Sequence, residues 1–389
     1  MSQSFWCDDH QERVLGEFDV VIVGAGISGL STAYWLNQHD SQLKVAIVDK
    51  GAIGSGATGR NAGFLTCGSV EHFNRMVSKH GEDQALAIWH FAEENQKLLS
   101  TEIIKDQSST VEFERKGAFS LAASPSELKE LSQVSDLMGQ HGISVESLDQ
   151  KGVESRLGAK GFVGGIKYKD DASVHPIKLL RLIQAKVQAD IFEYHPVHKI
   201  SKGSSGERWL QTDRGKIKAM AVVLCCNGYS AALDPYFEDK IYPTRGQIMM
   251  LEPVAHFMEG PCYANFYLDY FRQLPSGALL IGGFRQLEAD TEKGFSDHTT
   301  EKIQKALHDF VLKHLPQFKG AAVTHRWAGV MGFSVDGEPM IGSLPTDDQI
   351  FFCGGFTGHG IGLAFNTGRH LSGLIFGKSV PDWLSSRRF

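Results

Sequence analysis

Residues 19–30 read DVVIVGAGISGL, and residues 45–50 read VAIVDK. The two runs predict a strand, a glycine turn, a helix and a second strand, which together form a dinucleotide-binding βαβ unit. Gly24 permits the tight turn, Gly26 lets the backbone approach a pyrophosphate, and Gly29 lets the helix pack close to the sheet. Free N–H groups at the helix N-terminus then face the diphosphate. Asp49 is expected to accept hydrogen bonds from both hydroxyl groups of the adenosine ribose.

The segment after Asp49 indicates which dinucleotide is bound. A nicotinamide enzyme usually continues into an ordinary helix, whereas residues 51–64 read GAIGSGATGRNAGF and show no apolar periodicity. Small residues and backbone amides at this density suit a chain that lies against a second, larger part of a cofactor. Thr58, Arg60 and Asn61 are the available polar contacts. The alternative interpretation is a flexible surface loop.

The GSGATGRNAGF run and the first motif together resemble the D-amino-acid oxidase superfamily of FAD-dependent amine oxidoreductases. The resemblance covers nearly the whole chain. This superfamily includes glycine oxidase, sarcosine oxidase and gamma-glutamylputrescine oxidase. The resemblance implies bound FAD. The expected cofactor-binding residues are Gly24, Gly26, Ser28, Gly29, Asp49, Lys50, Ala57, Thr58, Arg60, Asn61, Ala62, Gly63, Phe64, Val197, Gly228, Gly358, His359, Gly360, Ile361 and Gly362.

Three later segments are similar to the family's cofactor contacts. Val197 stands where a valine backbone reaches the adenine, and Gly228 follows an apolar strand at 221–226. Residues 354–362 read GGFTGHGIG after a strand at 350–353 and lead into a helix near Leu363. The N-terminus of that helix could polarise the flavin pyrimidine. His359 is either a catalyst or a histidine whose ring packs in the turn.

Composition excludes several other classes of protein. The chain has 389 residues, a net charge of −6 and dispersed basic residues, so it is not expected to bind nucleic acid. No apolar run is long enough to span a membrane, and the first 17 residues lack the apolar region of a secretory signal. Six cysteines show no framework spacing, and Cys225 and Cys226 are expected to be buried thiols in a cytoplasmic protein. Motifs for metal sites, hydrolases and kinases are absent.

The predicted fold class is α/β, with a Rossmann-type FAD-binding domain interleaved with an α+β substrate domain on a large, mostly antiparallel sheet. The FAD domain is expected at 15–70, 151–233 and 336–389, and the substrate domain at 71–150 and 234–335. Helices are predicted at 84–105, 126–140, 176–188 and 296–314, and substrate-domain strands at 117–122, 246–252, 263–267, 270–274 and 278–284.

Flavin amine oxidation needs a substrate C–H held at the flavin, in a dry site that disfavours the ammonium form of the amine. The expected reaction is oxidation of a C–N bond by hydride transfer to FAD, giving an imine that hydrolyses. Catalytic candidates are Tyr270, Arg272, Arg326 and His359; further candidates for the wall of the site are Tyr263, Asn265, Phe266, Tyr267, Trp327 and Met331. The run around Tyr270 looks most like the gamma-glutamylputrescine oxidase branch.

Departures from the family pattern bear on the substrate. Met331 stands where glycine oxidase-like members carry the arginine that binds the substrate carboxylate, so an amine without an adjacent carboxylate is expected unless Arg272 or Arg326 replaces that arginine. Gly329 stands near the place of a flavin-linking cysteine, so FAD is expected to be noncovalent. The oxygen-activating lysine is replaced by Leu280 or Ile281, which leaves O2 or another electron acceptor open.

Other functions compete with amine oxidation. One is an amino-acid oxidase or dehydrogenase of the glycine or sarcosine type. An NAD-dependent dehydrogenase would explain the first motif but neither GSGATGRNAGF nor GGFTGHGIG. An RNA-modifying flavoprotein is disfavoured by the acidic balance.

Overall fold

The computed structural model describes residues 13–265 and 269–389. They divide into two compact units, which the chain visits alternately. Of the described residues, the first unit, the nucleotide unit, contains 13–59, 179–244 and 331–389. The second, the substrate unit, contains 60–178, 245–265 and 269–330. The expected bounds placed 60–70 and 151–178 with the nucleotide domain, and 234–244 and 331–335 with the substrate domain. These segments lie in the opposite units.

The nucleotide unit is built on a sheet of strand order β17-β18-β11-β1-β2-β8, to which β10 and β9 are added through β11. Strands β11, β1, β2 and β8 are parallel. The bounds are β1 Val14–Val23, β2 Val45–Val48, β8 Asp190–Phe192, β9 Val197–Lys202, β10 Arg208–Thr212, β11 Gly215–Leu224, β17 Met340–Leu344 and β18 Asp347–Gly354. Continuous apolar runs such as Val20–Val23 are typical of parallel strands that are buried on both faces.

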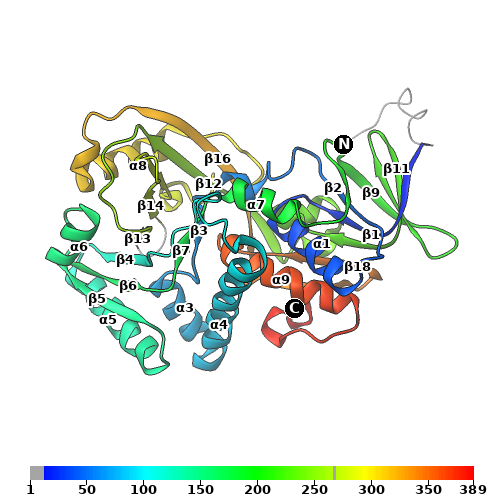
Figure 1. Ribbon diagram of the computed structural model, residues 1–389, viewed down its shortest axis with the longest axis horizontal. Helices are drawn as coiled ribbons and strands as arrows, with labels where there is room; N and C mark the ends of the chain where they lie inside the picture. The colour runs from blue at the N-terminus through cyan, green and yellow to red at the C-terminus, as the bar shows by residue number, and fades with distance from the viewer. Residues whose placement is uncertain (1–12, 266–268) are drawn as a thin grey trace. The chain divides into compact units, whose positions relative to one another are not determined.

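Two helices of this unit pack side by side, α1 (Ile27–His39) and α9 (Gly360–Ile375), as Figure 1 shows in blue and red. A methyl group on Gly368 would lie 2.8 Å from the backbone nitrogen of Thr32, so this glycine permits the close approach. The Trp35 indole donates a hydrogen bond to the carbonyl of Phe365 at 3.0 Å. Helix α1 packs on β1 and β2, and α9 packs on β17 and β18.

The substrate unit contains a second sheet of strand order β16-β12-β15-β14-β13-β4-β6-β5. Most neighbours are antiparallel, while β13 and β4 are parallel. The bounds are β4 Ala118–Ala122, β5 Val145–Asp149, β6 Gly164–Tyr168, β12 Ile241–Leu251, β13 Cys262–Ala264, β14 Asp269–Gln273, β15 Leu279–Gly282 and β16 Val323–Ser334. A separate ribbon pairs β3 (Phe64–Leu65) with β7 (Ala172–Ser173). Because β6 lies between β4 and β5, residues 164–168 belong to this unit.

The expected helices are present with shifted ends. They are α4 Glu82–Leu98 with a π-helical extension Leu99–Ile104, α5 Pro125–Gln140, α7 Pro176–Gln184 and α8 Glu301–His314. Three helices that were not predicted are α3 Val70–His80, α6 Gln150–Leu157 and the short α2 Ala57–Arg60. The N-cap of α5 is Ser124, whose hydroxyl accepts the N–H of Glu127. The strand expected at 263–267 ends at Ala264, and its residues 266 and 267 lie outside the described residues.

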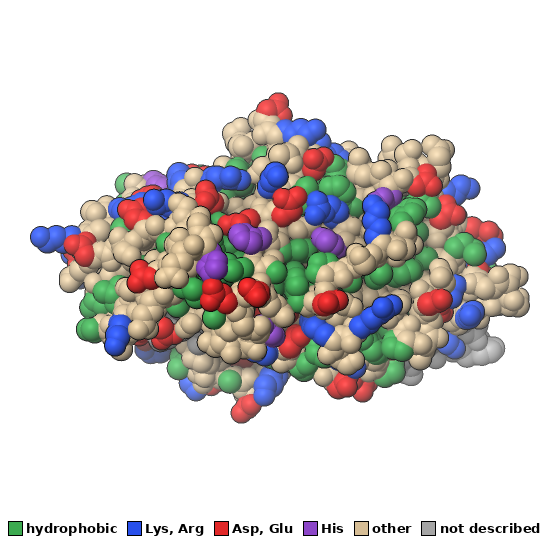
Figure 2. Space-filling model, turned by 90° about the horizontal axis from the view of Figure 1, so that it is seen from below, with side chains coloured by type: hydrophobic (Ala, Val, Ile, Leu, Met, Phe, Trp, Pro, Cys, Tyr) green, Lys and Arg blue, Asp and Glu red, His purple; other side chains and the backbone are tan. Residues whose placement is uncertain are grey.

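Surface charges of both signs are mixed on one face (Figure 2), and two neighbouring cysteines differ in burial. On the face drawn in Figure 2, acidic and basic side chains intermix. Within the described ranges, no helix combines the length and apolarity needed to cross a membrane. Cys225 is buried, as expected, and its sulfur lies 3.6 Å from that of Cys353. Cys226, which was also expected to be buried, is half-buried.

Candidate functional site

The glycine turn of the nucleotide unit leaves no room for side chains. Gly24 has φ +115°, and a methyl group there would lie 2.6 Å from the carbonyl oxygen of Cys225. A methyl group on Gly29 would lie 1.9 Å from the carbonyl oxygen of Gly24. At Gly26 the nearest atom would be the Thr58 hydroxyl at 3.1 Å. Gly24 and Gly29 therefore occupy the tight turn and the close packing position that the sequence predicted, and approach of a pyrophosphate at Gly26 stays a prediction.

The Asp49 carboxylate holds this turn from the end of β2. Its Oδ2 accepts the N–H of Ala25 at 2.7 Å, and its Oδ1 accepts the N–H of Gly51 at 2.8 Å. The Thr58 hydroxyl accepts the N–H of Ile27 at 3.0 Å. Each carboxylate oxygen keeps a second lone pair, so Asp49 can bind ribose hydroxyls while it fixes the turn.

These residues fit FAD. The N-cap of α1 is Gly26, which has no side chain, and Thr58 occupies only the N–H of Ile27, so the N–H groups that follow in the first turn can face a diphosphate. Ser28, Lys50 and Ala57 flank the same turn, and the Lys50 ammonium lies 3.3 Å from the centroid of the Tyr229 ring. Val197 begins β9, downstream of His195, whose N–H donates to the carbonyl of Asp49 at 2.8 Å. Contact of Val197 with the adenine remains a prediction.

The second glycine turn of this unit is built around Asn227. The Asn227 side chain accepts the N–H of Gly355 at 2.9 Å, and its own backbone is left-handed, with φ +46°. Gly228 packs tightly, since a methyl group there would lie 2.8 Å from the carbonyl oxygen of Met331. Sequence reasoning missed Asn227, although an Asn-Gly pair after a buried strand is a signal for such a turn.

Residues 358–362 connect this turn to α9. His359 is the N-cap residue, and its Nδ1 lies 3.1 Å from the carbonyl oxygen of Thr357. The ring is thereby oriented by the turn itself, which supports the interpretation of His359 as a residue of the turn. Gly358 has φ +87°, and the sulfur of Met331 lies 3.9 Å from where its methyl group would be.

In the substrate unit, one face of the sheet carries the tyrosines. Tyr263 and Tyr270 are opposite each other, and Arg272 is opposite Leu280. Opposite residues in an antiparallel pair lie on one face, and residues two apart on a strand do so too. All four side chains therefore share a face, which we call the tyrosine face. Ile281 points to the other face and packs with α8 residues.

The segment 60–66 lies on the tyrosine face. Ala62 and Phe64 pack with Ile248, Tyr270 and Leu280, and Thr66 and Tyr263 share a hydrogen bond of 2.6 Å between their hydroxyls. The Asn61 side chain accepts the N–H of Gly63, which has φ +72°. The Arg60 guanidinium donates to the carbonyl of Ala328 at 2.7 Å. Residues 60–66 are therefore packed and hydrogen-bonded within the substrate unit.

The structure separates the two candidate arginines. Arg272 is buried on the tyrosine face, two residues from Tyr270 on β14. Arg326 is exposed on β16, the edge strand, where it lines a surface groove of about 470 Å³ with Thr300, Lys305 and His308. Of the two, only Arg272 shares a face with the tyrosines. Phe266 and Tyr267 lie outside the described residues.

Asp269 was missed by sequence reasoning. It is fully buried and accepts the N–H of Phe284 at 2.6 Å and a hydrogen bond from the side chain of Asn265. Both partners have left-handed backbones, with φ +59° and +49°. Burial raises the pKa of Asp269 to about 6. An acid at the start of an apolar strand gives no sequence signal for these contacts, because they form only when β13, β14 and β15 meet.

Comparisons with known proteins agree with this geometry. The family model described as FAD dependent oxidoreductase matches residues 19–374. A protein of Rhizobium meliloti (strain 1021) named probable oxidoreductase OrdL is 27% identical over 93% of this chain and 84% of its own length. The glycine oxidase of Bacillus licheniformis is 27% identical over 95% of this chain and 96% of its own length.

Solved structures show the same fold. The glycine oxidase structure from Geobacillus kaustophilus has a TM-score of 0.80 at 22% identity, and the similarity covers 94% of this chain and 96% of that one.

Proposed function

The chain belongs to the FAD-dependent oxidoreductase family, and we propose that it oxidises the C–N bond of a small amine or amino acid to an imine, which water then hydrolyses. The observation that carries this proposal is the tyrosine face, which lies under a segment expected to contact the cofactor. When bound, FAD supplies the acceptor for a hydride leaving the carbon next to nitrogen.

The residues of the nucleotide unit would hold the cofactor. Gly24, Gly26 and the N-terminus of α1 suit the diphosphate, and Asp49 suits the ribose. Residues 358–362 at the N-terminus of α9 place backbone N–H groups and a helix dipole where they could stabilise negative charge. These assignments rest on the backbone geometry of each turn.

The tyrosine face would orient the substrate and keep water away. Phe64, Leu280 and Ile248 make it apolar, and such surroundings disfavour the ammonium form of an amine. Burial raises the pKa of Tyr270 to about 12, so its hydroxyl stays protonated and can donate a hydrogen bond. Tyr270 is therefore the residue we assign to substrate contact. Arg326 receives no role, because it is exposed at the sheet edge.

The test is to mix purified holoenzyme anaerobically with a panel of amines and amino acids. Reduction of the flavin is measured as the loss of the absorbance of oxidised flavin. We expect at least one compound with a C–N bond to reduce the flavin within the mixing experiment. The matched control is a panel of the corresponding alcohols and hydroxy acids. Reduction by the alcohols alone, or by NADH alone, would contradict the proposal.

The proposal also covers the electron acceptor and the cellular location. The resemblance places Leu280 or Ile281 where related oxidases carry an oxygen-activating lysine, and neither side chain is charged, so either O2 or another acceptor is compatible with the proposal. Reoxidation in air, compared with reoxidation by an artificial quinone, distinguishes the two. We expect the protein to act in the cytoplasm on a small molecule, without nucleic acid.

A further inference from the structure

Gly282 lies directly beneath the ring of Tyr270 in the substrate unit. The two residues are opposite each other on β15 and β14, so Gly282 belongs to the tyrosine face. A methyl group on Gly282 would lie 2.5 Å from Oη of Tyr270, 2.6 Å from Cζ and 2.7 Å from Cε2. The phenol end of the ring therefore lies across β15, in space that a side chain at position 282 would fill.

The backbone beneath this ring is held from several sides. Gly282 is opposite Ile248 of β12 as well as Tyr270 of β14, so it lies in the interior of the sheet. Two residues further on, the N–H of Phe284 donates to the buried Asp269 carboxylate at 2.6 Å. The Tyr270 side chain, by contrast, is half-buried. If a side chain is added at position 282, the ring is therefore the group that can move.

Phe64 restricts the direction in which the Tyr270 ring can move. Its ring centroid lies 5.8 Å from that of Tyr270 and 5.2 Å from that of Tyr263. Tyr263 is fixed in turn by its hydrogen bond of 2.6 Å with Thr66. The Tyr270 ring is thus bounded by Gly282 beneath it and by Phe64 beside it. A ring displaced from Gly282 has to rise from the sheet into the space in front of the tyrosine face.

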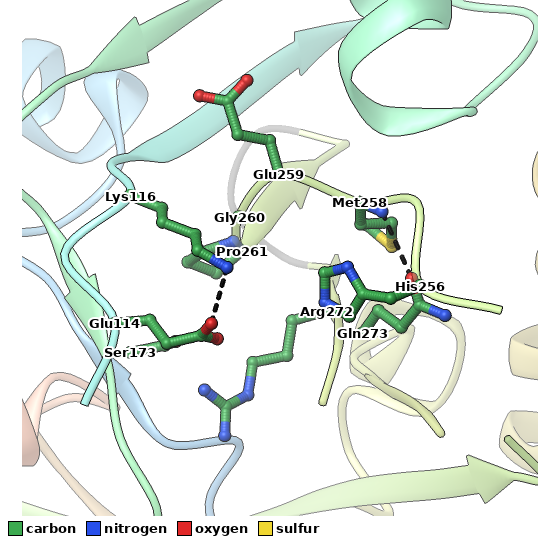
Figure 3. Close-up of a pocket in the computed structure, with 10 residues that line it drawn as sticks. All are labelled: Glu114, Lys116, Ser173, His256, Met258, Glu259, Gly260, Pro261, Arg272 and Gln273. Atoms are coloured by element: carbon green, nitrogen blue, oxygen red, sulfur yellow. Dashed lines mark hydrogen bonds and ion pairs between the residues drawn. The ribbon is translucent and has the colours of Figure 1, made fainter. Parts of the chain in front are cut away.

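The Arg272 end of the tyrosine face is covered. The Arg272 Nη2 donates to the carbonyl of Val174 at 3.1 Å and lies 2.9 Å from the place that a methyl group on Gly63 would take. The cavity beside Arg272, drawn in Figure 3, has a volume of about 10 Å³ and admits about one water molecule. A small molecule can therefore reach this face at the half-buried Tyr270, where the position of one ring determines the available room.

We propose that Gly282 is a specificity-determining residue, which leaves room for the substituents of a larger amine or amino acid by letting the Tyr270 ring lie across β15. This inference rests on the proposed function, in which Tyr270 contacts the substrate, and it concerns the size of that substrate. A side chain at position 282 raises the ring and restricts the site to small substrates.

Matched substrates test the proposal on the holoenzyme. Ethylamine and butylamine, and D-alanine and D-norvaline, differ by two methylene groups. We expect Gly282→Ala to slow flavin reduction by the larger member of each pair about tenfold more than reduction by the smaller one, since one methylene group in a site changes discrimination by roughly ten- to two-hundredfold. The control is Gly139→Ala in α5 of the same unit, where no atom lies within 4 Å of the added methyl group. Its substrate ratios should equal those of wild type.

Variants of Tyr270 show whether its ring causes the effect. Tyr270→Ala has no ring to displace, so the addition of Gly282→Ala should leave the substrate ratios of that variant unchanged. Tyr270→Phe keeps the collision with Cζ and Cε2, so the addition of Gly282→Ala should again disfavour the larger substrates. Equal effects of Gly282→Ala in these two backgrounds would mean that the strand, and not the ring, is responsible.

Nitration of tyrosines by tetranitromethane separates this proposal from the proposed function. Tandem mass spectrometry of the treated holoenzyme gives the nitrated fraction of Tyr270 relative to that of Tyr194, which is 56% exposed. A ring that rises from the sheet is more accessible, so Gly282→Ala should increase this ratio and Gly139→Ala should not. If no amine or amino acid reduces wild type, the proposed function fails, and the nitration ratio still decides whether Gly282 positions Tyr270.

Four results would overturn the assignment of Gly282. The first is a nitration ratio that Gly282→Ala leaves unchanged, and the second is equal slowing of both members of each pair. The third is a wild-type protein that is reduced only by the smaller members. The fourth is an insoluble Gly282→Ala protein, because the backbone would then have to move in place of the ring.

Discussion

Asp49 accepts the backbone N–H of Ala25 at 2.7 Å, so the carboxylate that the sequence assigns to a ribose also anchors the glycine turn. A second bond, from the N–H of Gly51 at 2.8 Å, ties the same carboxylate to the segment that follows β2. The expected cofactor contact and the shape of the turn would therefore be coupled through one side chain.

Asp49→Ala should weaken FAD binding by about ten- to a hundredfold, since loss of a charged hydrogen-bonding group costs on the order of 1.5–3 kcal/mol. Titration of apoprotein with FAD measures the effect. The control is Asp19→Ala, because Asp19 also accepts a backbone N–H, that of Lys44 at 2.8 Å, but in the middle of β1, beside the start of β2. Equal FAD affinity in both variants would exclude the role of Asp49.

Gly29→Ala should abolish FAD binding or prevent the chain from folding into a soluble protein, because the added methyl group would lie 1.9 Å from the carbonyl oxygen of Gly24. Gly56→Ala is the matched control, since no atom lies within 4 Å of its added methyl group. We expect the control to change stability by about 0.5 kcal/mol or less. Soluble yield and the ratio of flavin to protein absorbance report both variants; a yellow, soluble Gly29→Ala protein would disprove the packing argument.

FAD should be released by acid precipitation and remain in the supernatant. Position 329 cannot supply a linking cysteine, and a side chain there would collide with Arg60, whose Cβ would lie 2.8 Å from the new Cβ. Absorbance of the supernatant and of the redissolved pellet gives the two fractions. Yellow colour that stays in the pellet would show a covalent link elsewhere.

Glu292→Gln should destabilise the substrate unit by about 3–5 kcal/mol, the usual cost of breaking a buried ion pair. Glu292 has an exposed fraction of 1% and receives two hydrogen bonds from Arg245, at 2.6 and 3.0 Å. Asp290→Asn is the control in the same loop, because the Asp290 side chain is 96% exposed and its pair with Lys293 is worth about 0–1 kcal/mol. Chemical denaturation compares the two. Similar small losses would mean that the buried pair contributes little.

Asp269 should make stability fall as the pH rises from about 4 to about 6. Burial raises the folded-state pKa from 3.8 to about 6, so in this window the unfolded chain releases a proton that the folded chain retains. Below the window both states are protonated, and above it the loss is complete, at roughly 3 kcal/mol. Asp269→Asn should lack this slope. Parallel pH curves for the two proteins would show that Asp269 does not titrate in this range.

Local sequence patterns predicted most of the helices, strands and turns, but they did not predict which other elements each of them contacts. The glycine turn, Asp49 and Thr58 lie within 35 residues of one another, and their arrangement follows from backbone rules that act over short distances. The helix start at Ser124-Pro125 is equally local. The unit boundaries could not be read in this way, because residues 164–168 join the substrate sheet by pairing with β4 and β5, and no local pattern shows which strands will pair.

The sequence by itself determined that the chain has a dinucleotide-binding turn, a second glycine turn and aromatic strands. Only the tertiary structure decided that Arg272 is buried beside Tyr270 while Arg326 is exposed at an edge. Strand register sets which face a side chain occupies, and sheet order sets whether that face meets water. In the same structure Glu114 is paired with Lys116 and Glu112 with Lys178. Such pairings can be seen only once all the neighbours of a side chain are in place.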